Sequence, residues 1–122
     1  ATPVGFEPAA DVIAWAKEQA GFELVTDPSV AVTGADVVVT DVWASMGQES
    51  EAKERISKFA GYQVNKTLMD CAKDDAIVLH CLPAHREEEI TKEILEQHAD
   101  VIFDEAENRL HVQKAVLVTL LG

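Results

Sequence analysis

The sequence predicts an α/β protein with a three-layer arrangement, in which helices cover both faces of a parallel sheet of about four strands. Three observations support this fold, which is Rossmann-like or flavodoxin-like. Short apolar, β-branched runs alternate with segments of helical periodicity. Glycine, proline and capping residues separate these segments. The length of 122 residues, 48% of them hydrophobic, suits one domain, which we assign to residues 1–122.

The first part of the chain predicts two helical segments and two strands. Pro8 lies in the first turn of a helix that Gly21 ends, because glycine readily adopts the left-handed conformation of a helix stop. Asp27 caps a brief helical turn that ends near Gly34. The strands expected here are the short run Phe22–Val25 and the β-branched run Asp36–Thr40, which should be central.

The remaining chain predicts four helices and two strands. Asn65 is the expected N-cap of one helix, because its side-chain oxygen can accept a hydrogen bond from a free backbone N–H of the first turn. Gly61 ends the helix before it. The expected helices are Glu49–Ala60, the one over Leu68, Met69 and Ala72, the one from Thr91 to His98, and an apolar C-terminal helix from Asn108. The expected strands are Ala76–His80 and Val101–Phe103.

Three polar segments each follow an expected strand. They are Asp41–Gly47, His80–Pro83 and Asp104–Arg109. Because the carboxyl ends of parallel strands meet at one edge of a sheet, we expect the three segments to form a single binding site there.

Asp41 and Cys81 are the strongest candidates for chemistry in these segments. A carboxylate at a strand tip can pair with an amine, and a thiol beside it can lie against a reacting group. The alternative functions are structural: Asp41 as a turn cap, Met46 as a gap filler, Cys81 as a core residue and Arg109 as a solvated surface residue. His80 alternates with Cys81 along the strand, so it should pack or bond locally.

The same segments resemble a known family. Thr40-Asp41 followed by Ser45-Met46-Gly47, then His80-Cys81-Leu82-Pro83-Ala84-His85-Arg86, then Phe103 to His111, are similar to the second half of ornithine carbamoyltransferases. The likeness runs in order from Ala1 to Leu121. It implies transfer of a carbamoyl group from carbamoyl phosphate to the side-chain amine of L-ornithine, a step of arginine biosynthesis that needs no organic cofactor.

The resemblance also implies roles for individual residues. Asp41 and Ser45 would bind the α-amino group of ornithine, and the backbone around Met46 its carboxylate. Cys81 and the Leu82 carbonyl would contact the side-chain amine. Arg109 would act at the carbamoyl end, so Cys81, Asp41 and Arg109 are the expected catalytic residues. Glu87 stands where bacterial members of the family usually have glycine, which bears on the geometry of that turn.

The resemblance covers only part of such an enzyme. The Ser-x-Arg-Thr loop that holds the phosphate belongs to a preceding carbamoyl phosphate domain, and nothing in this sequence resembles it. We therefore expect an ornithine-binding half-site, with weak affinity if any, that is inactive alone. The first strand and helix of the domain would also be absent. The strands should then re-pair, either with Phe22–Val25 beside Val37–Thr40 or through a homodimer that buries the apolar C-terminal helix.

Composition narrows the choice of partners. There are 22 acidic and 10 basic residues, a formal net charge of −12, which disfavours nucleic acid and anionic membranes. The sequence has no apolar stretch of about 20 residues and no leader of the usual kind. Two cysteines, Cys71 and Cys81, show no disulfide pattern, so we expect a reducing cytoplasm. No spacing matches a structural zinc site, although adventitious zinc at Cys81 is conceivable.

Two functions of other classes compete with this one. A non-catalytic folding module with relic loops is nearly as well supported as weak ornithine binding. A receiver-like phosphoacceptor domain is the weaker alternative. Such a domain requires an acidic pair after its first strand and a lysine at the end of its last strand, and this chain has Asp104-Glu105 at the place of the lysine.

Overall fold

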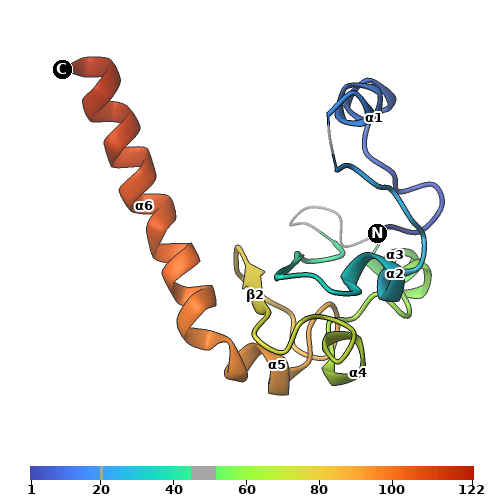
Figure 1. Ribbon diagram of the computed structural model, residues 1–122. Helices are drawn as coiled ribbons and strands as arrows, with labels where there is room; N and C mark the ends of the chain where they lie inside the picture. Colours follow the sequence, from blue (N-terminus) through green and yellow to red (C-terminus); the bar gives the residue numbers. More distant parts are fainter. Residues whose placement is uncertain (20, 45–51) are drawn as a thin grey trace.

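The computed structural model describes residues 1–19, 21–44 and 52–122, and it has the expected α/β composition (Figure 1). In chain order the elements are α1 (Ala10–Lys17), α2 (Pro28–Val32), β1 (Val37–Thr40), α3 (Ala52–Lys58), α4 (Lys66–Met69), β2 (Ile77–His80), α5 (Lys92–Gln97) and α6 (Ala99–Leu121). No helix in these residues combines the length and the apolar character needed to cross a membrane.

The sheet of the described chain consists of two strands, β1 and β2. They are parallel and in register, with Val37 opposite Ile77 and Thr40 opposite His80. The predictions of these two strands and of parallel pairing are confirmed. The prediction of about four strands was wrong, because two further apolar runs take other conformations.

The first of these runs, Phe22–Val25, forms no strand. A strand needs a hydrogen-bonded neighbour, and in the described chain the backbone contact of this segment is a single bond from the Thr2 N–H to the Val25 carbonyl, at 3.1 Å. The segment therefore has strand-like composition without a ladder to join. It does not lie beside β1 in this structure.

The second run, Val101–Phe103, belongs to helix α6. Its Ile102 N–H donates to the His98 carbonyl at 3.0 Å, as an α-helix requires. The residues after it are rich in Ala, Glu, Leu, Lys and Gln, which favour a helix, and helix formation extends cooperatively back through three β-prone residues. The predicted C-terminal helix is thus confirmed, but it begins at Ala99 rather than at Asn108.

Side-chain caps begin three of the helices. Asn65 Oδ1 accepts from the Leu68 N–H at 3.0 Å, which confirms the predicted N-cap of α4. Asp27 Oδ1 accepts from the Ser29 N–H at 2.9 Å and confirms the start of α2. Thr91 accepts from the Ile94 N–H and caps α5. The predicted helix over residues 49–60 is confirmed for Ala52–Lys58, and residues 49–51 lie outside the described chain.

The core lies on one face of the sheet. Its buried members come from both strands, from α2, α4, α5 and α6, and from the segments between them: Val32, Val38, Val64, Leu68, Val78, Ile90, Ile94, Leu95 and Ile102. On the other face of β1 the side chains of Val37 and Val39 remain 44% and 67% exposed. The predicted third layer therefore does not cover β1 in this structure, although parallel sheets are usually buried on both faces.

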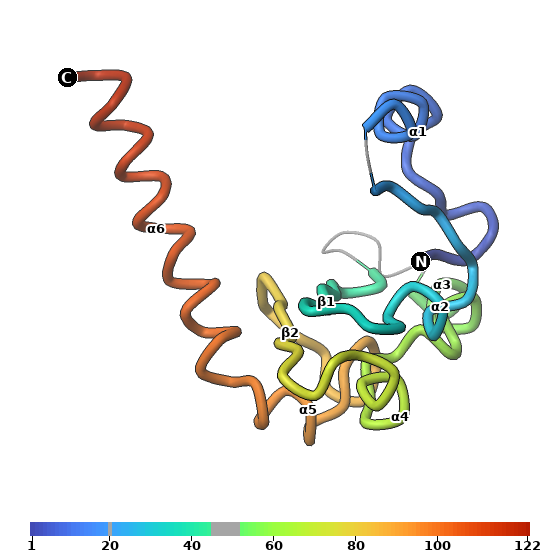
Figure 2. The backbone as a smooth tube through the Cα atoms, in the orientation of Figure 1, coloured from blue at the N-terminus to red at the C-terminus, as the bar shows by residue number. Residues whose placement is uncertain are grey.

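Two parts of the chain extend away from this core (Figures 1 and 2). Helix α6 contacts β2 and α5 near its start, and its last turns extend beyond the sheet. On the opposite side α1 stands clear of the sheet, with Trp15 63% exposed. The predicted helix stop at Gly21 was wrong in position: α1 ends at Lys17 with Glu18 as its C-cap, and Gly21, whose φ of 84° is left-handed, lies beyond the end of the helix.

Candidate functional site

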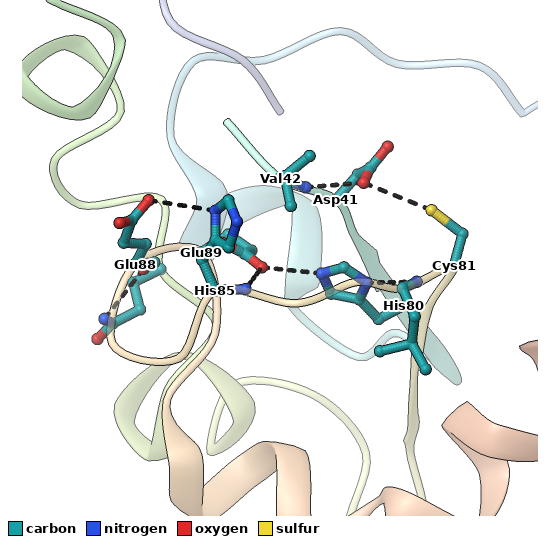
Figure 3. Close-up of polar contacts among 9 residues, drawn as sticks. Asp41, Val42, His80, Cys81, His85, Glu88 and Glu89 are labelled. Carbon is teal, nitrogen blue, oxygen red and sulfur yellow. Dashed lines mark hydrogen bonds and ion pairs between the residues drawn. The ribbon is translucent and has the colours of Figure 1, made fainter. Parts of the chain in front are cut away.

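The candidate site lies where β1 and β2 end side by side (Figure 3). Asp41 follows β1 and Cys81 follows β2, and because the strands are parallel and in register the two residues meet at the same edge. The Cys81 thiol donates to Asp41 Oδ1 at 3.4 Å, and the same oxygen accepts from the Val42 N–H at 2.7 Å. Both side chains are exposed. Asp41 Oδ2 has no hydrogen-bond partner among the described residues and can therefore receive an ammonium group.

The electrostatics of this pair keep Cys81 protonated. Partial burial raises the pKa of the Cys81 thiol above its ordinary value of 9.0, and the hydrogen bond and negative charge of Asp41 raise it further, with Glu105 adding a smaller effect. A thiolate is the reactive form of cysteine. Cys81 is thus suited to contact a ligand as a neutral thiol and is poorly suited to nucleophilic attack at neutral pH.

This arrangement predicts how Cys81 responds to alkylation. Replacing Asp41 with asparagine removes the carboxylate charge that disfavours the thiolate, so the pKa of Cys81 should fall and its alkylation by iodoacetamide at pH 8 should become roughly threefold faster or more. The rate should rise with pH in both proteins, with the midpoint at lower pH in Asp41→Asn.

Peptide mass mapping measures the two native thiols separately. Cys71 is the internal control, because it lies half-buried against the core and its reaction rate should not change. Equal rates at Cys81 in the parent protein and in Asp41→Asn would contradict the predicted coupling.

A buried histidine and glutamate support the turn behind Cys81. His80 and Glu89 are both fully buried, and His80 Nε2 lies 2.9 Å from Glu89 Oε1. The Leu82 N–H donates to His80 Nδ1 at 2.9 Å, so Nδ1 carries no proton and Nε2–H is the donor to Glu89. Glu89 Oε1 also accepts from the His85 N–H at 2.7 Å. The prediction that His80 bonds locally is confirmed.

These contacts fix the backbone of the His80–Pro83 turn. Leu82 has a φ of 55°, a left-handed conformation that is unfavourable for a residue with a side chain, and its peptide bond to Pro83 is cis. The bond from its N–H to His80 holds it in place. Because the Leu82 N–H is occupied, the Leu82 carbonyl is the backbone group that remains for a ligand.

Glu87 shows how the chain accommodates a non-glycine residue in the next turn. Its φ of 68° is left-handed, a conformation that costs a residue with a Cβ atom about 1–2 kcal/mol. Its carboxylate accepts from the Lys92 N–H at 2.9 Å, at the first turn of α5, and its own N–H donates to the Ile90 carbonyl. The position is therefore one where glycine would fit, and Glu87 offsets its strain by capping α5.

Of the other predicted site residues, Arg109 makes no contact with this pair that the described chain records. Arg109 is exposed on α6, and no hydrogen bond or ion pair in the described chain joins it to Asp41, Cys81 or Leu82. Its segment follows no strand, so the expected meeting of three loops reduces to two. Ser45 and Met46 lie outside the described residues.

Two groups of side chains have possible metal-ligand atoms that lie close together. The ligand atoms of Asp41, His80 and Cys81 lie within 4.8 Å of one another, yet both ring nitrogens of His80 are hydrogen-bonded to protein groups. His85, Glu88 and Glu89 form a second such group, in which Glu89 Oε1 accepts two hydrogen bonds while the buried Oε2 has no hydrogen-bond partner in the described chain.

Sequence reasoning missed Glu89. It lies within the run Glu87-Glu88-Glu89, which is typical of a solvated surface. Two features of the sequence could have indicated that Glu89 is buried. It directly precedes the apolar Ile90, and it lies nine residues after His80, whose ring at the end of a strand needs a hydrogen-bond acceptor.

Comparison with known proteins agrees with the motifs of this site. The family model described as aspartate/ornithine carbamoyltransferase, Asp/Orn binding domain, matches residues 1–120. The ornithine carbamoyltransferase of Pyrococcus horikoshii is 56% identical over 127 residues, covering 100% of this chain and 40% of that protein.

Solved structures give the same result. The anabolic ornithine carbamoyltransferase of Campylobacter jejuni matches with a TM-score of 0.93 and 43% identity, over 98% of this chain and 41% of that one. The enzyme from Pyrococcus furiosus matches with a TM-score of 0.85 and 54% identity, over 96% and 39% of the two chains. The chain spans about 40% of the length of these relatives. On this evidence the chain belongs to the aspartate/ornithine carbamoyltransferase family and matches its Asp/Orn binding domain.

Proposed function

We propose that this chain supplies the ornithine-binding half of a carbamoyltransferase site. The observation that carries the proposal is the Asp41–Cys81 pair, held at 3.4 Å on the shared carboxyl edge of β1 and β2. A carboxylate with one oxygen available binds an ammonium group strongly through a charge-assisted hydrogen bond. The family to which the chain belongs, and the names of its relatives, make ornithine the substrate to test first.

The roles of the residues follow from their chemistry. Asp41 anchors the cationic α-amine, and the neutral Cys81 thiol and the Leu82 carbonyl lie against the side-chain amine. That amine must lose a proton before its nitrogen attacks the carbonyl carbon of carbamoyl phosphate. The new C–N bond forms as the C–O bond to phosphate breaks, and phosphate leaves with the electron pair. Ser45, Met46 and Arg109 complete the proposed set, with Arg109 at the carbamoyl end.

The chain alone should not catalyse this transfer. Its Arg109 is not assembled with Asp41 and Cys81, and the Ser-x-Arg-Thr type loop expected to hold the phosphate has no counterpart in the sequence. Loss of one group that stabilises charge in a transition state often costs about 10²-fold or more in rate. With ornithine and carbamoyl phosphate supplied, we expect citrulline formation equal to the uncatalysed background. A rate above background from the purified chain would overturn this expectation.

Ornithine binding tests the half-site directly. Isothermal titration should show weak binding to the parent chain, and Asp41→Asn should weaken it about tenfold or more because the ammonium loses its charged partner. Asp36→Asn is the matched control: it removes the same charge at the start of β1, where Asp36 pairs with Lys73 at 2.5 Å. Equal affinities for the parent and Asp41→Asn would reject the assignment of Asp41.

A non-catalytic folding module remains the second candidate. The observation in its favour is that, among the described residues, no hydrogen bond or ion pair joins Arg109 to the Asp41–Cys81 pair. On this hypothesis neither the parent chain nor Asp36→Asn would bind ornithine at millimolar concentration. The receiver-domain alternative is set aside, because the chain belongs to a different family.

We also propose that the chain associates as a homodimer in a reducing cytoplasm. Both cysteines are free thiols. The second half of α6 exposes more apolar surface than a solvated helix usually does, and this surface should be buried in an assembly. Its exposed members are Leu110, Val112, Val116, Leu117, Val118, Leu120 and Leu121. A mass of one chain by light scattering at high concentration would contradict the proposal.

A further inference from the structure

A group of potential metal ligands lies in the loop between β2 and α5. His85, Glu88 and Glu89 each offer one ligand atom, and these atoms lie within 4.8 Å of one another (Figure 3). One imidazole and two carboxylates form a donor set that suits divalent transition-metal ions such as Zn²⁺. None of the three residues belongs to the Asp41–Cys81 pair.

The observation that points to a cation is an unsatisfied oxygen of Glu89. The side chain is fully buried, and its Oε1 already bonds to His80 Nε2 and to the His85 N–H. Its Oε2 is also buried and has no hydrogen-bond partner in the described chain. A buried polar atom without a partner is costly, so native proteins usually supply a protein group, a water or an ion. Because Oε1 is occupied, Oε2 is the atom of Glu89 that can bind an ion.

The two exposed members of the group already have the spacing of metal ligands. His85 Nδ1 lies 3.6 Å from Glu88 Oε2. With metal–ligand bonds of about 2.0–2.2 Å, two ligand atoms of a tetrahedral zinc site are about 3.3–3.6 Å apart. Both side chains are about half-exposed, so they can turn toward Glu89 without disturbing the core. A zinc ion would thus have three protein ligands, with the fourth position open to water.

Hydrogen bonds hold the backbone that carries these ligands. The Glu88 N–H donates to the His85 carbonyl at 3.0 Å, which closes a tight turn between the two residues. Gln63 Nε2 donates to the Glu88 carbonyl at 3.0 Å, and the Val64 N–H donates to the Glu89 carbonyl at 2.8 Å. Because these last two donors come from the segment before α4, the turn is fixed to a distant part of the chain. Little ordering is therefore needed when an ion binds.

We propose that His85, Glu88 and Glu89 form a binding site for a divalent transition-metal ion, with Zn²⁺ as the first ion to test. The two carboxylates supply negative charge, and the formal net charge of −12 makes the surrounding field favourable to cations. Mg²⁺ should bind less well, because it prefers oxygen ligands and retains its waters.

The proposed role of the ion is structural. It would bind the carboxylate that accepts from His80, and His80 in turn accepts from the Leu82 N–H. A bound ion would therefore stabilise the turn after β2 together with its own turn. The site is independent of ornithine binding, so either proposal can fail without the other.

Isothermal titration with zinc chloride tests the site in a Cys81→Ser background, which removes a competing thiol. One zinc ion per chain should bind. Glu88→Gln in that background should raise the dissociation constant about tenfold or more, because a charged ligand is lost. Glu107→Gln is the matched control, since Glu107 lies 3.2 Å from His111 on α6 and the same change there should leave the affinity unaltered. Equal affinities in Glu88→Gln and the background protein, or no binding at millimolar zinc, would overturn the proposal.

Nitrogen NMR of the histidine rings locates the ion without relying on one substitution. Zinc should shift the Nδ1 resonance of His85 in the Cys81→Ser protein and leave the ring resonances of His111 unchanged. Glu89→Gln should abolish the shift, because its amide oxygen stays with His80 and its N–H groups face the ion. A shift at His111 alone, or at no histidine, would overturn the site. A His85 shift that persists in both glutamine variants, Glu88→Gln and Glu89→Gln, would reduce it to a lone histidine and also overturn it.

Discussion

Replacing Glu89 with alanine should lower the free energy of unfolding by about 3 kcal/mol, because it leaves one fully buried donor and one partly buried donor without an acceptor. Those donors are His80 Nε2–H and the His85 N–H, both of which bond to Glu89 Oε1. The side chains of His80 and Glu89 are fully buried, so water cannot replace the lost acceptor. Urea denaturation at pH 7 measures the effect.

Glutamine at the same position separates hydrogen bonding from packing. Glu89→Gln keeps an acceptor oxygen of nearly the same shape, so its free energy of unfolding should lie within about 1 kcal/mol of the parent value. Glu89→Leu fills the space without an acceptor and should resemble the alanine variant. If glutamine proves as damaging as alanine, the hydrogen bonds are not the source of the stability.

Replacing Ile102 with alanine should cost about 3 kcal/mol, in the range found when a buried isoleucine is truncated. Ile102 is 0% exposed and belongs to the core cluster, whereas the neighbouring Phe103 is 61% exposed. Phe103→Ala should therefore change the free energy of unfolding by no more than about 0.5 kcal/mol. This difference between adjacent residues follows from their places on helix α6.

The comparison also tests the structure of that segment. In the strand predicted from the sequence, Val101 and Phe103 would point to one face of the sheet and Ile102 would point to the other. Both faces of such a parallel sheet would be buried. Truncating Phe103 would then cost several kcal/mol. A loss of stability at Phe103 equal to that at Ile102 would favour the strand and contradict helix α6.

Local signals in the sequence were sufficient for several parts of the structure. Asn65 and Asp27 cap their helices because a short polar side chain satisfies N–H groups one turn away, which requires no distant partner. The Asp41–Cys81 contact was also predictable. Two short strands of equal length that pair in parallel and in register must bring the residues after them together.

Other predictions failed because they depended on a neighbour that the sequence does not specify. Phe22–Val25 has strand composition, but a strand exists only when another edge accepts its hydrogen bonds. Val101–Phe103 is only three residues long, and its helix-forming successors decide its conformation. The role of Arg109 was predicted together with that strand, whereas in the described chain Arg109 is exposed on α6 and has no hydrogen bond or ion pair with Asp41 or Cys81.

The sequence by itself determined the family, the parallel pairing of β1 with β2 and the meeting of Asp41 with Cys81. These features follow from hydrophobic periodicity, helix caps and the order of the motifs, which depend only on residues that are close together in the sequence. Only the tertiary structure decided which carboxylate supports the site. Three consecutive glutamates have different environments in the structure. Glu87 caps α5, Glu88 is half-exposed beside His85, and Glu89 is fully buried against His80. Burial and pairing depend on contacts between segments, and a run of three glutamates contains no local signal that distinguishes its members.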